Sequence, residues 1–134
     1  PVSGEPADLV FHDFFSPAVA PRLWGRKIFS RIRESMREDG LLLTYSAATR
    51  TRSALLLAGF RVGRGPGTPM KTESTQATLR GRLDEPLGRD WLEKLGRSAR
   101  PLPEDAGPAE AALAALRACE QFSVAAIDIK RQPL

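Results

Sequence analysis

Apolar and polar positions along the chain predict strands that alternate with helices. Residues 7–12 form a short apolar run that reads as a buried strand, and residues 41–45 form a second run of strand length. Between them, large apolar side chains at three- and four-residue steps predict a helix over 21–38, which Asp39 and Gly40 are expected to end. The side chains on its apolar face are Leu23, Trp24, Ile28, Ile32 and Met36.

The same pattern continues to about residue 80. A second helix is expected over 48–58, followed by a short strand over 60–62. Glycine and proline residues between 63 and 69 predict a loop, because a regular helix or strand does not tolerate so many of them. A strand returning from this loop is expected over 75–79. Strands joined by helical crossovers indicate an α/β sheet.

The last fifty residues have a different character. A short helix over 90–95, an extended Pro-rich linker over 100–105 and an Ala-rich helix over 108–122 are expected there. Residues 124–129 fit either a strand or an ordered tail. We therefore expect a partial sheet domain over 1–81 and a mostly helical C-terminal extension over 82–134.

Composition excludes several classes of protein. The chain has 134 residues, of which 42% are hydrophobic and 27% charged, a balance typical of a globular domain. No apolar run approaches the length of a membrane-spanning helix, and the first residues show no signal-peptide pattern, so we expect a cytoplasmic protein without membrane contact. A single cysteine, Cys119, excludes a cysteine-built metal site, and a single histidine, His12, argues against a histidine metal cluster or a Ser-His-Asp triad.

The charge is unevenly distributed along the chain. The formal net charge is +4, but residues 22–80 hold twelve Lys and Arg residues against four acidic ones. Arginine dominates there, and its planar guanidinium suits phosphate groups, which favours RNA or another polyanion as a partner. The alternative is that the arginines reflect an Arg-rich composition and only form solvent-exposed helix faces. The scattered positions of the charges, which are not gathered in one run, leave this alternative open.

The residues suited to chemistry follow the two predicted strands, where open α/β sheets bind their ligands. Asp13 comes directly after the first strand and precedes Phe14, Phe15 and Pro17. A carboxylate beside flat apolar surface suits a planar base or an amine nucleophile. The alternative is that Asp13 caps a turn or helix while the phenylalanines pack in the core.

The second strand ends in hydroxyl side chains. Thr44, Tyr45 and Ser46 enter the loop before the second predicted helix. Hydroxyl groups there can line a ligand pocket next to the first strand end. Ser and Thr before a helix more often serve as N-caps, so both interpretations stay open.

Residues 13–24 carry a specific resemblance. They are similar to a signature written Asp-x-Phe-(Ser/Ala)-Pro-x-x-x-Pro-x-(Leu/Met)-Trp, and residues 39–48, 58–62 and 65–73 continue the likeness, with Thr72 departing from the usual arginine. The signature resembles that of bacterial tRNA wobble-uridine methyltransferases, which complete 5-methylaminomethyl-2-thiouridine. The family occurs alone or fused to an FAD-dependent oxidase, and the likeness covers about residues 8–80.

The resemblance implies a Rossmann-like sheet and S-adenosylmethionine as cofactor. Residues 8–80 would supply strands four to seven of the methyltransferase sheet with their helices. The family's Gly-rich cofactor loop after the first strand has no counterpart here, since Gly63 and Gly65 follow a late strand and open no helix. The chain is thus expected to be either a fragment of the enzyme or a truncated relative.

The resemblance also assigns roles around the first strand end. Asp13 would be the catalytic acid that accepts a proton from the amine or orients its N–H bonds, and Asp13 with Phe14 would meet the cofactor. Phe15 would pack against the base or the cofactor. Pro17 would stiffen the loop and lie near the substrate. Trp24 would either contact the substrate or belong to the core.

Further roles fall on the second strand end and the late loop. Tyr45 and Ser46 would line the pocket. Lys71 would meet tRNA phosphate or would pair with Glu73 in solvent, and Glu73 would lie on the same substrate-facing loop. His12 is expected to be a packed neutral residue and Cys119 a small helix-face residue.

Two functions follow from these patterns. The first is S-adenosylmethionine-dependent methylation of tRNA by an enzyme of which this chain is a part, with FAD required only if an oxidase domain is fused elsewhere. The alternative is a non-catalytic RNA-binding module or truncated paralogue. A sheet cut at strand four leaves an unpaired edge, which favours pairing of two chains into a homodimer.

Overall fold

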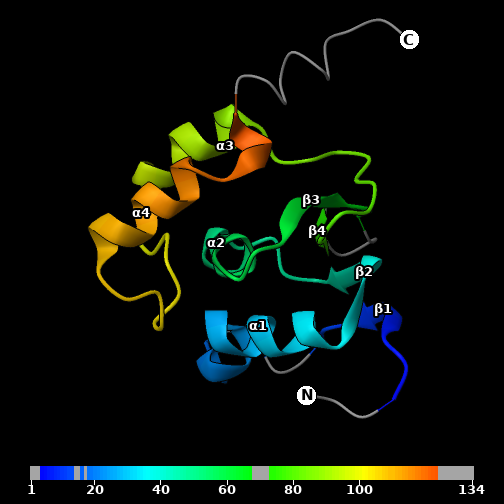
Figure 1. Ribbon diagram of the computed structural model, residues 1–134. Helices are drawn as coiled ribbons and strands as arrows, with labels where there is room; N and C mark the ends of the chain where they lie inside the picture. The colour runs from blue at the N-terminus through cyan, green and yellow to red at the C-terminus, as the bar shows by residue number, and fades with distance from the viewer. Residues whose placement is uncertain (1–3, 14–15, 17, 68–72, 124–134) are drawn as a thin grey trace, which may run out of the picture.

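The structure is a computed structural model that describes residues 4–13, 16, 18–67 and 73–123 (Figure 1). Its four strands form one sheet in the order β1-β2-β4-β3. β1 and β2 are parallel, and β4 is antiparallel to both of its neighbours. The strands are β1 (Ala7–Phe11), β2 (Met36–Thr44), β3 (Arg61–Gly65) and β4 (Ser74–Thr78). The expected α/β class with two late antiparallel strands is confirmed.

Helices connect the strands and build the extension. A 3-10 turn and α1 lie between β1 and β2, α2 leads into β3, and the remaining helices follow β4. Their bounds are η1 (Pro21–Trp24), α1 (Arg26–Glu34), α2 (Thr49–Leu57), α3 (Arg89–Lys94), η2 (Leu95–Arg97), α4 (Ala109–Arg117) and η3 (Glu120–Phe122). The Ala-rich helix therefore ends at Arg117, five residues before its predicted end.

One row of side chains across the sheet forms the centre of the core. Val10, Leu42, Ala77 and Val62 are paired in register from β1 to β3, and the last three are completely buried. Figure 1 shows α1 and α2 on the same side of the strands. These helices cover the face that carries the row, because Leu55 of α2 belongs to the same core.

The first strand is not buried as its sequence predicts. β1 is an edge strand, and Leu9 and Phe11 are 48% and 67% exposed. A continuous apolar run is typical of strands covered on both faces. Within the described residues only the face with Val10 is covered, so the alternate side chains meet solvent.

The predicted helix end at Asp39 and Gly40 is wrong. α1 ends at Glu34, and both residues lie inside β2. The register of β1 on β2 shifts between Ala7 and Leu9, and a side chain at Gly40 would stand 3.0 Å from the carbonyl oxygen of Ala7. Gly40 thus permits close strand approach at an irregularity, not a left-handed helix cap.

The predicted loop is also wrong at Gly63 and Gly65, which belong to β3. Gly63 forms a bridge with Pro86, and an added Cβ would stand 2.7 Å from the carbonyl oxygen of Glu85. The outer side of β3 is therefore covered by the chain at residues 85–87, unlike the outer side of β1. Glycine is needed there because another backbone segment approaches closely.

The C-terminal extension packs into the same core as the sheet. Trp91 of α3 stacks on Phe122 with ring centroids 6.0 Å apart, and Leu95 and Leu116 are buried with them. Leu102, within the predicted linker, also packs against this core. Of the helices that the structure describes, none is both long and apolar enough to span a bilayer.

Candidate functional site

The carboxyl ends of β1 and β2 bring Asp13 and Tyr45 together. The backbone N–H of Tyr45 donates to Oδ1 of Asp13 at 3.2 Å. Asp13 remains exposed, and Tyr45 is half-buried. Parallel strands end at the same edge of a sheet, so two residues separated by 32 positions in sequence meet here. The contact joins the Asp13 carboxylate to the backbone of Tyr45, and the phenylalanines expected beside Asp13 lie outside the described residues.

The two strand ends are tied together just before these residues. Thr44 is buried, and its hydroxyl donates to the carbonyl oxygen of His12 at 2.6 Å. The N–H of His12 in turn donates to the carbonyl of Leu43 at 2.8 Å. The backbone of His12, the residue before Asp13, is thus held through both its N–H and its carbonyl group.

His12 fills the space beneath the site. Its side chain is 1% exposed, its ring meets Trp24 edge-on at 4.4 Å, and its Nε2 lies 2.6 Å from the carbonyl oxygen of Leu23. That contact requires a proton on Nε2, because a carbonyl only accepts. Burial lowers the pKa of His12, partly opposed by its backbone contacts and Asp13. His12 is therefore neutral near pH 7, as expected from the sequence.

Trp24 lies in the core beside the site. It is 3% exposed, and its ring also meets that of Tyr45 edge-on at 5.4 Å. This placement agrees with the core alternative for Trp24. Its effect on the site is to support the Tyr45 ring rather than to offer a surface of its own.

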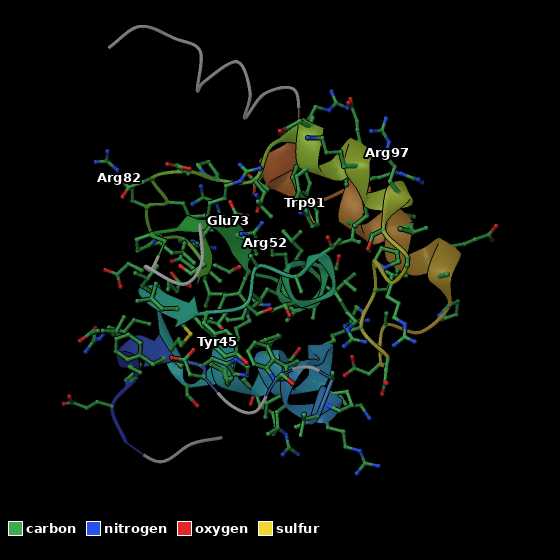
Figure 2. The ribbon with its side chains drawn as sticks, turned by 180° about the vertical axis from the view of Figure 1, so that it is seen from behind. Tyr45, Arg52, Glu73, Arg82, Trp91 and Arg97 are labelled. Atoms are coloured by element: carbon green, nitrogen blue, oxygen red, sulfur yellow. The ribbon has the colours of Figure 1, made fainter. Side chains whose placement is uncertain are left out.

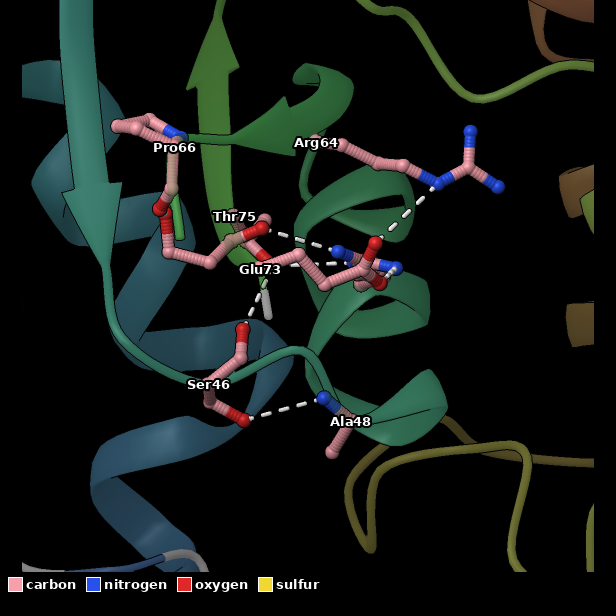
Figure 3. Close-up of polar contacts among 8 residues, drawn as sticks. Ser46, Ala48, Arg64, Pro66, Glu73 and Thr75 are labelled. Carbon is pink, nitrogen blue, oxygen red and sulfur yellow. Dashed lines mark hydrogen bonds and ion pairs between the residues drawn. The ribbon is translucent and has the colours of Figure 1, made fainter. Parts of the chain in front are cut away.

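Ser46 is turned inward, away from solvent. It is 4% exposed, and its hydroxyl lies 3.1 Å from the hydroxyl of Thr51. The same hydroxyl accepts from the N–H of Ala48 at 3.3 Å (Figure 3). In this structure its side chain therefore stabilises the turn before α2, but it does not cap the helix, because the N-cap residue of α2 is Ala48 and no side chain caps it. Its carbonyl accepts from the Thr75 hydroxyl at 2.6 Å.

Glu73 forms ion pairs with two arginines. Its carboxylate lies 3.0 Å from Arg52 and 3.5 Å from Arg64, and Figure 2 shows Glu73 and Arg52 next to each other. Arg52 is 3% exposed, and desolvation lowers its pKa while Glu73 raises it. Glu73 thus neutralises a buried cation, a role that the sequence did not suggest.

Several predicted site residues lie outside the described part of the chain, and their roles stay predictions. They are Phe14, Phe15, Pro17 and Lys71. Thr72, the departure from the family pattern, lies outside it as well.

Arg52 and Thr75 are the polar residues that the sequence reasoning missed. Arg52 precedes Leu55 and Leu56 by three and four positions, which places it on the same side of α2 as these two apolar residues. That spacing was the available signal. The partners in β4 were not visible in the sequence, because strand pairing sets them.

Other candidate chemistry is limited in the described residues. No group of three or more His, Cys, Asp and Glu side chains gathers there in a way that could hold a metal ion. Cys119 is half-buried after α4, and its thiol donates to the carbonyl of Ala115 at 3.4 Å. Burial raises the pKa of this thiol, which keeps it protonated and weakly nucleophilic.

Comparison with known sequence families identifies the family of this domain. Residues 1–80 match the model of the S-adenosyl-L-methionine-dependent methyltransferase family. The chain belongs to this family. The strand order agrees with the α/β fold expected from the resemblance, and the resemblance found in residues 8–80 is confirmed.

Individual relatives point to one branch of the family. The chain is 31% identical over 129 residues to the tRNA 5-methylaminomethyl-2-thiouridine biosynthesis bifunctional protein MnmC of Acidovorax, and 36% identical over 95 residues to that of Ralstonia nicotianae. These matches cover 95% and 66% of this chain but 20% and 14% of the relatives. The chain therefore spans a fifth or less of the length of these proteins.

A solved structure shows the same arrangement. The crystal structure of MNMC2 from Aquifex aeolicus matches with a TM-score of 0.67 and 33% sequence identity. The match covers 87% of this chain and 39% of the other chain. Since it reaches beyond the 80 residues of the family match, part of the C-terminal extension belongs to the shared fold.

Proposed function

We propose that this chain is the carboxyl-terminal part of a tRNA methyltransferase that N-methylates an aminomethyl group on the wobble uridine. The observation that carries the proposal is the exposed carboxylate of Asp13, held by the Tyr45 N–H at the end of β1. Membership of the methyltransferase family and the names of the relatives supply the reaction class and the substrate class.

The residues at the strand ends suit the reacting side of such a site. The cofactor, when bound, supplies an electrophilic methyl group on a sulfonium sulfur. A new N–C bond forms as the S–C bond breaks, and the amine must present a lone pair and finally lose a proton. Asp13 can orient the amine N–H bonds and accept that proton, while the Tyr45 N–H holds one of its carboxylate oxygens.

The decisive experiment replaces Asp13 in the full-length protein. Asp13→Ala is expected to reduce kcat for methyl transfer to tRNA by at least about 100-fold. Asp84→Ala removes another exposed carboxylate, from the extension, and is expected to leave turnover unchanged. Thermal unfolding of both variants checks folding. Near-normal turnover by a folded Asp13→Ala protein would remove this residue from the mechanism.

A non-catalytic RNA-binding module is the alternative, and the exposed cations of α1 favour it. Arg26, Lys27, Arg31 and Arg33 are all exposed on this short helix. Phosphate contacts release counterions, so tRNA affinity should fall steeply with salt concentration. The alternative predicts this salt dependence without S-adenosylmethionine binding, whereas the enzyme predicts both. Isothermal titration with each ligand separates them.

The proposal extends to partners and location. The resemblance implies a fused FAD-dependent oxidase domain, and the word bifunctional in the names of the relatives supports a second activity. A flavin absorption spectrum of the full-length protein tests this. A cytoplasmic location follows from tRNA as the expected substrate. Homodimerisation is proposed only for the isolated 134-residue chain, in which β1 is an edge strand and Leu9 and Phe11 are exposed. Light scattering on wild type and Phe11→Arg tests it, and a monomeric wild type contradicts it.

A further inference from the structure

We propose that Arg52 and Thr75 are positioning residues that hold the turn after β2, and through it the Tyr45 N–H that orients Asp13. This inference rests on the proposed role of Asp13 as the reacting carboxylate. It assigns a function to a hydrogen-bond network that runs from Glu73 through Arg52 and Thr75 to the backbone of Ser46 (Figure 3).

Arg52 is the centre of this hydrogen-bond network. Its guanidinium donates to Thr75 Oγ1, to Glu73 Oε1 and to the carbonyl of Ser74, each at 3.0 Å. Burying a guanidinium is unfavourable unless hydrogen bonds to its donors offset the lost hydration, so displacing an acceptor from a buried arginine is costly and the acceptors are held in place. The first residues of β4 are therefore fixed against the start of α2.

Thr75 passes this constraint to the turn. Its hydroxyl accepts from Arg52 and donates to the carbonyl of Ser46 at 2.6 Å, and the residue is completely buried. A hydroxyl has a single proton, so the bond from Arg52 leaves that proton committed to Ser46. The Ser46 carbonyl is thereby anchored one residue beyond Tyr45.

The geometry at Asp13 depends on that anchor. The bond from the Tyr45 N–H to Asp13 is 3.2 Å long, at the upper limit for this type of bond. A small rotation of the Tyr45–Ser46 backbone would break it and release the carboxylate. Misplacement of a reacting group by about 1 Å can cost about 100-fold in rate.

The chain offers a matched control in Thr78. It is also buried in β4, its hydroxyl donates to the carbonyl of Gly40 at 2.7 Å, and it accepts from the N–H of Gly81 at 2.9 Å. Thr75 and Thr78 thus each donate one bond to a carbonyl and accept one N–H. Only Thr75 leads to the site.

The experiment compares Thr75→Val with Thr78→Val in the full-length protein. Both variants are expected to lower Tm by similar amounts, but only Thr75→Val is expected to lower kcat, by about 10- to 100-fold with little change in KM for tRNA. An equal loss of kcat in both variants, or full activity in Thr75→Val, would overturn the proposal.

Arg52 is tested by conservative and disruptive replacement. Arg52→Lys keeps the charge but loses the planar fork, and it is expected to recover only part of the kcat lost in Arg52→Met. Equal kcat in Arg52→Lys and wild type would show that the fork has no positioning role.

Hydrogen exchange of the full-length protein provides a readout that needs no activity. A peptide containing Tyr45 should exchange faster in Thr75→Val than in wild type, and no faster in Thr78→Val. If the wild type proves inactive as a methyltransferase, the proposed function fails, while this exchange difference still decides whether the turn is held as described. Identical exchange in the two threonine variants would overturn the positioning role.

Discussion

Asp105 caps the helix that begins after Gly25, 80 residues earlier in the chain. Its carboxylate accepts the backbone N–H groups of Arg26 and Lys27 at 2.8 and 2.9 Å. Gly25 itself has no side chain to do so, and an added Cβ would stand 2.8 Å from the Asp105 carboxylate. The C-terminal extension thereby supplies the N-cap of α1, where the helix dipole favours a negative charge.

Loss of this tertiary cap should destabilise the protein. Asp105→Ala is expected to lower the free energy of unfolding by about 1–2 kcal/mol, and Asp105→Asn by less, because the amide oxygen still accepts. Glu104→Ala is the control, since Glu104 is exposed and adjacent. Urea denaturation measures all three, and equal midpoints for Asp105→Ala and Glu104→Ala would contradict the capping role.

Gln121 is expected to form a second stabilising contact between the C-terminal extension and the sheet. Its side-chain amide accepts the N–H of Val62 and donates to the carbonyls of Val62 and Leu87, all at 2.9–3.0 Å. It thus occupies the outer edge of β3. Gln121→Ala is expected to cost about 1–3 kcal/mol, because it leaves backbone groups of the strand without these bonds.

The neighbouring residue supplies the control for that measurement. Glu120→Ala removes an exposed side chain from the same 3-10 turn and should change stability little. Hydrogen exchange should also show faster exchange at the Val62 amide in Gln121→Ala only. Unchanged protection there would mean that Gln121 does not cover this strand edge.

Ser53 is expected to be a site of easy stabilisation. Its hydroxyl is completely buried in α2 and has no hydrogen-bond partner among the described residues. Burying an unpaired hydroxyl costs about 1–3 kcal/mol, so Ser53→Ala should keep or raise Tm. Differential scanning calorimetry tests this, with Ser46→Ala, which removes a bonded hydroxyl, expected to lower Tm. A clear loss of stability in Ser53→Ala would reveal an unrecognised partner.

His12 should make stability depend on pH. Burial lowers its pKa in the folded state below the ordinary value of 6.5. Its contribution is therefore fully present above pH 6.5 and is lost as the pH falls toward the folded-state pKa, because the unfolded chain takes up a proton that the native state resists. His12→Gln should show a smaller fall in the free energy of unfolding between about pH 7.5 and about pH 5. Parallel pH profiles for the two proteins would refute this.

Sequence patterning predicted which residues meet at the strand ends better than it predicted the element boundaries. Asp13 and Tyr45 follow apolar runs of strand length, and parallel strands bring such ends together without further information. Gly40 and Gly63, in contrast, are predicted from the sequence to lie at a helix end and in a loop, but they permit close backbone approach inside strands. A glycine has no side chain that distinguishes these uses, so only the neighbouring backbone reveals which one applies.

Local sequence by itself determined the fold class, the alternation of strands and helices, and the carboxylate at the end of the first strand, because periodicity and strand-end chemistry depend on neighbours in the chain. Tertiary structure alone decided that Arg52 pairs with Glu73 and that Asp105 caps α1. Each of these depends on which distant segments lie side by side, and burial of charge or apolar surface is a property of that packing, not of the local sequence.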